Sequence, residues 1–238
     1  MLAALGAKLP TEEIFKEKYE SDFKGKEALA LEHALDIRKF EIDLYWKRAT
    51  YFWTFIGAAL AGFVAVQSLD GENQKNLSVI LSCLGSVFSY AWILVNRGSK
   101  FWQENWEKHV DLLEDSEIGP LYKTVLHRND HQGLKEKALH FATGSSYISV
   151  SKINHIVSLY MFLLWFVLVI YSLWPINPNL PFNWLYVVLP ALTFICCASF
   201  HILCKTYSGG YEPKATQRTT SLKSANKSMQ STASASAD

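Results

Sequence analysis

The sequence predicts an all-α integral membrane protein with four transmembrane helices. Half of the 238 residues are hydrophobic and only 19% are charged. Three stretches contain no Asp, Glu, Lys or Arg, namely 49–69, 76–96 and 153–204. A helix of about 20 apolar residues spans the hydrocarbon core of a bilayer, so the first two stretches each predict one span. The third is twice as long and is interrupted by PINPNLPFN at 175–183, whose prolines indicate a turn. We therefore expect spans near 50–69, 77–96, 155–174 and 184–204.

The distribution of positive charge predicts the orientation of these spans. Nine Lys and Arg residues precede the first span, eight lie between spans two and three, and five follow span four. The loop at 70–75 has only Lys75, and the turn at 175–183 has none. The positive-inside rule then places both termini and the central segment in the cytoplasm. The apolar part of MLAALGAKLP is too short for a signal peptide.

The chain divides into five parts on this basis. We expect cytoplasmic N-terminal helices at 1–48, a transmembrane hairpin at 49–96, a cytoplasmic helical segment at 97–152, a second transmembrane hairpin at 153–205 and a disordered cytoplasmic tail at 206–238. The last 25 residues contain one leucine, one methionine and no aromatic residue. Such a composition buries too little apolar surface to offset the entropy of ordering.

The first cytoplasmic part contains two helical patterns. Thr11 is a candidate N-cap for a helix over 11–20, because acidic residues follow it in the first turn. Gly25 separates this pattern from 27–48, where Leu31, Leu35, Ile42 and Tyr45 form a helical stripe. Nothing breaks the second pattern before the first span, so it predicts one long helix over about 27–69.

The second span is also expected to continue beyond the membrane. In FWQENWEKHVDLLED at 101–115, Trp102, Trp106, Val110 and Leu113 share one face, while Glu104, Glu107, Lys108, Asp111 and Glu114 lie away from it. This pattern predicts a packing helix whose aromatic face lies on the 27–48 helix or on a neighbouring subunit. SEIGP at 116–120 should end it, 120–133 is expected to be irregular, 134–144 a short helix, and Ser149 or Ser151 the cap of span three.

Small residues in the first two spans suggest close helix packing. Gly57, Ala61 and Ala65 recur every four residues, as do Ala58 with Gly62, and Ser78 with Ser82 and Ser86. Such rows let helix backbones approach closely in lipid. They favour packing of spans one and two within a subunit; a subunit interface or a weakly polar lining of a water-filled path are the alternatives. Spans three and four are bulkier and are expected to face lipid. The four cysteines all fall within spans, where they are interpreted as packing residues.

The sequence contains no convincing catalytic or metal-binding pattern. Glu107 and His109 point to different sides of a helix, so they cannot share one ion. His127, Asp130 and His131 form a better loop cluster, although exposed loop histidines are common. The spans carry no charged residue at their centres, and motifs for phosphate binding, nucleophilic hydrolysis or zinc proteolysis are not found. We predict no catalytic residue, no cofactor, no bound metal and no nucleic-acid partner.

Three segments together resemble a known family. They are IRKFEIDLYWKRATYFWTFIGAALAGF at 37–63, NRGSKFWQENWEKHVDLLEDSEIGPLYK at 96–123 and SVSKINH at 149–155. Their order is similar to that of the RipA-type bacterial octameric membrane proteins, over about residues 27–205. The resemblance implies a homo-oligomer of eight subunits among membrane lipids, and it brings no catalytic residues.

We therefore predict an oligomeric inner-membrane assembly, channel-like or scaffolding, without enzymatic activity. The residues expected to pack helices or subunits are Gly57, Ala61, Gly62, Ser82, Ser86, Trp102 and Trp106. An alternative is a membrane-anchored stress or ligand sensor with a pocket near His127–His131. A lipid-modifying enzyme is a third hypothesis, for which Asn96, Arg97, Asn105 and His109 are the candidate polar residues.

Overall fold

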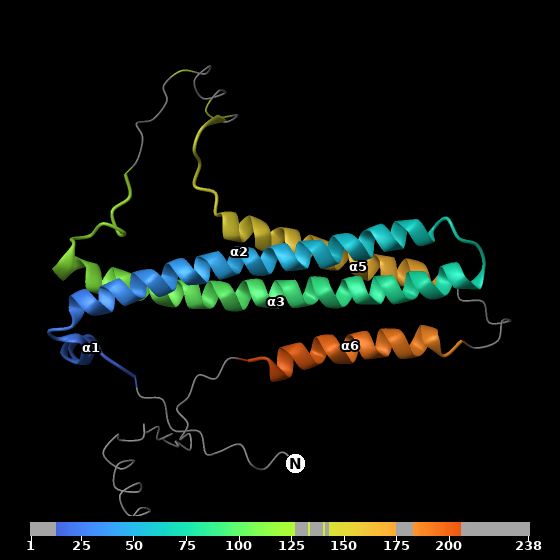
Figure 1. Cartoon of the computed structure of the whole chain (residues 1–238), viewed down its shortest axis with the longest axis horizontal. Helices are drawn as coiled ribbons and strands as arrows, with labels where there is room; N and C mark the ends of the chain where they lie inside the picture. The colour runs from blue at the N-terminus through green and yellow to red at the C-terminus, as the bar shows by residue number, and fades with distance from the viewer. Residues whose placement is uncertain (1–12, 127–132, 134–139, 141–142, 175–182, 206–238) are drawn as a thin grey trace, which may run out of the picture. The chain divides into compact units, whose positions relative to one another are not determined.

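The computed structural model describes residues 13–126, 133, 140, 143–174 and 183–205. In this part of the chain the secondary structure is helical throughout and includes no strand. The helices, which are labelled in Figure 1, are α1 (Lys16–Phe23), α2 (Glu27–Val66), α3 (Glu72–Glu117), α5 (Val150–Leu173) and α6 (Leu185–Leu203). All but α1 are long and apolar enough to cross a membrane. The predicted fold class, an all-α protein with four spans, is confirmed.

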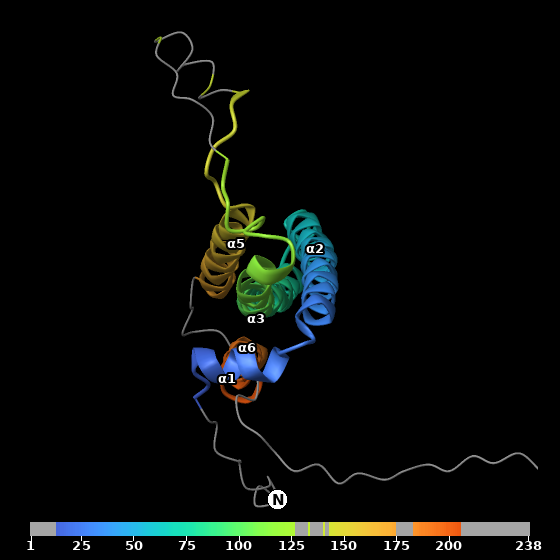
Figure 2. The same ribbon diagram turned by 90° about the vertical axis from the view of Figure 1, so that its left-hand side faces the viewer.

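Helix α3 is the centre of the arrangement, because it contacts α2, α5 and α6. Viewed along the helices, α3 lies between α2 and α5 (Figure 2). The turn that joins α2 to α3 ends at Gly71, whose φ of +78° favours glycine over any residue with a Cβ. Helices α2 and α3 therefore run antiparallel, and α5 returns antiparallel to α3 on the other side.

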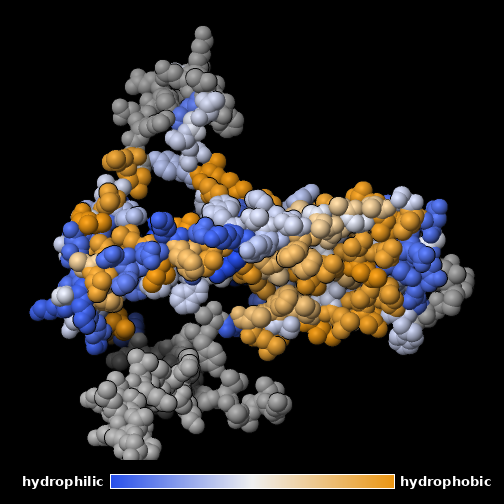
Figure 3. Space-filling model, viewed as in Figure 1, coloured by the Kyte–Doolittle hydropathy of each residue, from blue (hydrophilic) through white to orange (hydrophobic). Residues whose placement is uncertain are grey.

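Helices α2 and α3 continue far beyond their apolar segments, as the sequence predicts. Residues 27–48 of α2 and 97–117 of α3 each add roughly 30 Å of helix, at 1.5 Å per residue. The space-filling view shows the difference between the two halves: apolar surface dominates over the spans, and mixed charged surface covers the extensions (Figure 3). Helix α3 ends at Glu117, and Gly119 follows with a φ of +75°, which confirms the predicted stop at 116–120.

Two apolar clusters hold the helices together. In the spans, Ile56, Ala59 and Phe63 of α2 pack with Trp92 of α3 and Trp165 of α5. In the extensions, Leu31 and Ala34 of α2 pack with Val110 and Leu113 of α3, and Tyr19 and Phe23 of α1 lie against this second cluster. The same two long helices thus join the core of the spans to a second core in their extensions.

The expected start of the first helix is wrong. The first helix begins at Lys16 rather than after Thr11, because residues 13–15 are not helical and Phe15 occupies the N-cap position without a side-chain cap. A hydroxyl cap contributes only about 1 kcal/mol, and an isolated helix this short is marginal in water. Packing of Tyr19 and Phe23, one turn apart, therefore determines where α1 forms.

Helix α5 is not simply lipid-facing. It buries Asn154, Ser158, Trp165 and Ser172, which follow one another along one side of the helix. Much of the helix is nevertheless exposed, as expected of a lipid-facing span, and a few polar or bulky residues make its packing face. Ser149 caps this helix by accepting a hydrogen bond from the Lys152 N–H, as one of the two predicted alternatives. In α6, by contrast, no residue is buried.

Candidate functional site

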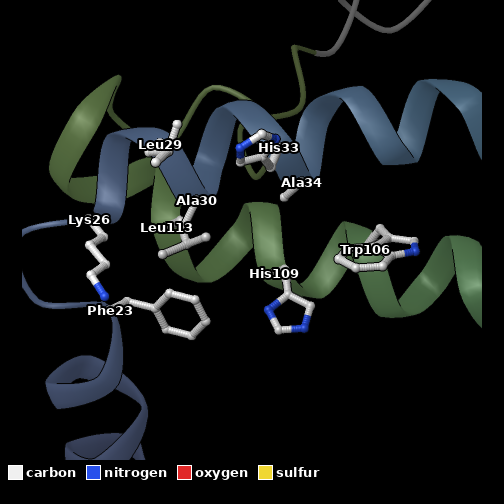
Figure 4. A pocket seen from close by; sticks show the side chains of 9 residues that line it. All are labelled: Phe23, Lys26, Leu29, Ala30, His33, Ala34, Trp106, His109 and Leu113. Atoms are coloured by element: carbon white, nitrogen blue, oxygen red, sulfur yellow. The ribbon is translucent and has the colours of Figure 1, made fainter. Parts of the chain in front are cut away.

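The structure contains a pocket outside the apolar spans, where α1, α2 and α3 meet (Figure 4). It has a volume of about 320 Å³. The residues that line it are Phe23, Lys26, Leu29, Ala30, His33, Ala34, Trp106, His109 and Leu113. Three separate helices contribute walls, so the pocket exists only while α1 is docked. The sequence did not indicate this pocket, since its lining residues are spread over 91 positions from Phe23 to Leu113.

His109, which lines the pocket, contacts three aromatic side chains. Its Nδ1 atom lies 2.8 Å from the Tyr19 hydroxyl, and the two rings stack with centroids 5.7 Å apart. Trp106 lies 5.6 Å away on the same helix, and Phe23 meets the imidazole edge-on at 6.5 Å. Burial among these rings lowers the pKa of His109 and raises that of Tyr19. Burial therefore favours the neutral form of both groups, which share a hydrogen bond between the Tyr19 hydroxyl and His109 Nδ1.

A second polar cluster lies at the end of the spans, where α2, α3 and α5 cross. Asn154 donates to the Tyr45 hydroxyl at 2.6 Å and to the Asn96 carbonyl oxygen at 3.3 Å, and Asn96 donates to Ser158 at 3.4 Å. Both asparagines are at most 5% exposed. The Asn154 Oδ1 atom has no hydrogen-bond partner within the described residues. The cluster fixes the three helices in register, because sliding any helix by one residue would break hydrogen bonds of the two buried amides.

Charged contacts join the extensions of α2 and α3. Arg38 lies 3.6 Å from Glu107 and also stands over the Tyr122 ring at 5.2 Å, and Lys100 reaches Glu107 at 3.7 Å. These contacts are partly exposed, so each contributes little by itself. The charged face of 101–115 is thus partly used within the subunit.

Glu114 differs from the other acids that the sequence analysis placed away from the aromatic face of this segment. It is fully buried, and its two carboxylate oxygens accept the N–H groups of Tyr122 and Lys123 at 2.7 and 3.1 Å. The chain reverses at Gly119, which brings 120–123 back over the end of α3. A carboxylate in this position satisfies backbone donors that would otherwise be buried without partners.

The predicted packing residues fall into different environments. Ser82 and Ser86 are buried, and a Cβ atom added at Gly62 would lie 3.4 Å from the Leu81 side chain. Gly57 and Ala61 are exposed, so the row that they begin does not face α3. Trp106 is half-buried against the Leu31 cluster, whereas Trp102 is 38% exposed and packs edge-on with Phe101.

The tightest helix contact involves a glycine that the prediction did not single out. A Cβ atom at Gly85 would overlap the indole of Trp165, which is completely buried. The serine and glycine row of α3 therefore meets α5 as well as α2. Gly85 lies within the row that includes Ser82 and Ser86, but nothing in the sequence indicated that its partner would be a tryptophan of span three.

The candidate residues for metal binding or lipid chemistry do not converge. Among the described residues, no three His, Cys, Asp or Glu side chains are grouped so that they could hold a metal ion. His127, Asp130 and His131 lie outside the described residues. Asn96 belongs to the buried amide cluster, whereas His109 lies 13 residues further along α3, a separation of about 20 Å.

The chain has the features of a multi-span membrane protein with a helical region beyond its spans. It has four apolar helices, a buried amide cluster where three of them cross, and two helices that extend past their apolar segments. A family model described as the octameric membrane protein family (8xMP) matches residues 28–174, and the chain belongs to this family. Neither a curated protein nor a solved structure matches the chain. The match includes α2, α3 and α5 but not α1, so two pocket residues, Phe23 and Lys26, precede it.

Proposed function

We propose that the chain assembles with seven copies of itself into a non-catalytic complex, channel-like or scaffolding, in a bacterial inner membrane. The observation that carries this proposal is membership of the octameric membrane protein family over residues 28–174. We further propose that both termini and the extensions of α2 and α3 lie in the cytoplasm. The excess of Lys and Arg on that side of the spans supports this orientation.

Exposed apolar side chains on the extensions support self-association. Phe101 and Leu112 are 61% and 59% exposed, and they lie about three turns apart on one face of α3. Lipid does not cover this part of the helix, and exposed apolar residues that line up along a helix favour a protein partner over water. Gly57 and Ala61, which α3 leaves uncovered, offer a second surface for close helix contact inside the membrane.

The assembly is tested by native mass spectrometry of the detergent-solubilised protein. The proposal predicts a dominant species of eight times the 27.0 kDa chain mass. Replacing both Phe101 and Leu112 with Glu should shift the population to smaller species, while Lys24→Glu, at an exposed position outside this face, serves as a charge control. A monomer or dimer for the unmodified chain would refute the proposal.

The two tryptophans of the 101–115 segment, Trp102 and Trp106, should have different roles. Trp106→Ala should lower stability, because Trp106 packs against the Leu31 cluster within the subunit. Trp102→Ala should instead change subunit number, since this side chain is more than one-third exposed. Identical effects of the two substitutions would argue against separate roles.

The orientation is tested by labelling single cysteines in whole cells, in a chain whose four native cysteines are replaced. A cysteine at Asp70, which is exposed in the turn between α2 and α3, should react with an impermeant maleimide added outside, whereas one at Glu117 should react only after the membrane is broken. The reverse pattern would overturn the orientation.

A second function, ligand sensing, is favoured by the pocket between α1, α2 and α3. Two of its walls belong to helices that continue without a break into the spans. A ligand that holds α1 in place would therefore act on helices that also cross the membrane. Hydrogen exchange of the spans with and without a bound ligand tests this alternative, which fails if only α1 responds.

A further inference from the structure

The pocket at the α1–α2–α3 junction is mainly apolar and has one charged lining residue. This residue is Lys26; His33 and His109 are the two other polar lining residues, and none is acidic. The other six are apolar, including the rings of Phe23 and Trp106. Such a surface matches a ligand that combines an apolar body with a negative group, and it disfavours a cation.

Lys26 is the group best placed to receive the negative charge. It precedes the first turn of α2, is exposed and forms no ion pair with any described residue. Its side chain extends beside the Phe23 ring, next to the pocket (Figure 4). Many other cations of the extensions, such as Arg38 and Lys100, are already paired with carboxylates.

The N-terminal end of α2 also favours a negatively charged ligand. Lys26 is the N-cap residue, and no side chain caps the free N–H groups of the first turn. Leu29 and Ala30, which belong to that turn, line the pocket. The N-terminal end of a helix attracts negative charge. Glu27 is the only acid in this turn, and it is not among the lining residues.

The apolar walls limit the size and shape of the rest of the ligand. About 320 Å³ lies at the lower end of the range for small-molecule pockets. Phe23, Trp106 and the His109 ring provide flat surfaces on which a planar body can pack. We propose that this pocket binds a small amphipathic anion, a carboxylate carried on an aromatic body.

This inference goes beyond the proposed assembly and names a ligand class for the sensing alternative, on which it rests. The ligand would hold α1 against α2 and α3, because Phe23 and Lys26 belong to α1 and the linker that follows it, and the remaining walls belong to the two long helices. Binding therefore predicts stronger protection of the Lys16–Phe23 backbone from hydrogen exchange.

The test uses 2-naphthoate as the probe and 2-naphthamide as a neutral molecule of nearly the same shape. Each is titrated by calorimetry into the full chain in lipid nanodiscs, with empty nanodiscs as the reference for partitioning into lipid. We expect one saturable 2-naphthoate site per chain. Binding of 2-naphthamide to the same site should be at least about tenfold weaker, because a charged hydrogen bond is lost.

Three variants locate the site. Lys26→Gln should weaken 2-naphthoate binding by about tenfold and leave 2-naphthamide binding unchanged. Lys24→Gln, at an exposed position two residues earlier that does not line the pocket, should have no effect. Ala30→Phe should abolish binding by filling the pocket, and its circular dichroism spectrum should confirm that the helices remain.

The possible results distinguish the anionic ligand class, the binding site and the assembly proposal from one another. Equal affinity for the two probes overturns the anionic class while leaving a ligand pocket, and with it the sensing alternative, intact. Equal loss in Lys24→Gln and Lys26→Gln, or the absence of saturable binding, overturns the site itself. The subunit number, measured separately by mass, decides the assembly proposal whatever the probes do.

Discussion

Substitutions at Gly85 and Trp165, made singly and together, directly test how the spans pack. Trp165 is completely buried, and its indole meets Phe63 edge-on with ring centroids 6.1 Å apart. The indole occupies the space into which a Cβ at Gly85 would project. We therefore expect each single substitution to destabilise the protein and the two together to compensate in part.

The magnitudes follow from the packing. Replacing a buried tryptophan with alanine costs about 3–5 kcal/mol in a water-soluble core. In lipid the transfer from water contributes little, so the packing loss for Trp165→Ala should be about 2–3 kcal/mol. Gly85→Val forces the helices apart and should cost about 1–3 kcal/mol. In the double variant the valine fills part of the vacated space, so its cost should be at least about 1 kcal/mol below the sum.

The assay is unfolding by added sodium dodecyl sulfate in mixed micelles, followed by circular dichroism. Gly98→Val is the matched control, because a Cβ at Gly98 meets nothing within 4 Å. The control should change the unfolding free energy by less than about 0.5 kcal/mol. Additivity of the two single substitutions, within about 0.5 kcal/mol, would refute the direct contact between Gly85 and Trp165.

Three further predictions follow from the polar contacts. Glu114→Gln should cost about 1.5–3 kcal/mol, because a charged acceptor of two backbone N–H groups is lost, and hydrogen exchange should rise at residues 121–124. Unchanged exchange there would contradict the buried contact. Burial lowers the pKa of His109 from its ordinary value of 6.5, so the docking of α1 should be complete above that pH and weaken as the pH falls through the lowered pKa. Hydrogen exchange of Lys16–Phe23 between pH 7.5 and 5.5 measures this, and His109→Gln should remove the pH dependence. Asn154→Ala should cost about 1–2 kcal/mol in the same detergent titration, since it removes two buried hydrogen bonds in lipid; a neutral result would contradict the register role of the amide cluster.

The sequence predicted the long helices because their signals are local. The length of each uncharged run, compared with the thickness of a bilayer, is enough to identify a span. The absence of proline and glycine breakers between Glu27 and Arg48 is likewise enough to continue α2 into water. Gly119 and Pro120 mark the end of α3 with the same directness.

Which face of each span is buried was harder to predict, because the spans are apolar on all sides. A row such as Gly57, Ala61 and Ala65 permits close approach but does not say which helix approaches. The buried face of α5 depends on Trp165 meeting a glycine 80 residues earlier in the chain, and no periodicity within either helix contains that information.

The sequence by itself determined that this is a four-span helical membrane protein whose two longest helices extend beyond the bilayer, because apolar length and helix breakers act within one segment. Only the tertiary structure decided that Asn96 and Asn154 pair, that Glu114 is buried, and that α1 closes a pocket beside His109. Each of these depends on the register between helices. A shift of one residue turns a helix by about 100°, so the side chains that face one another are fixed only when the helices pack.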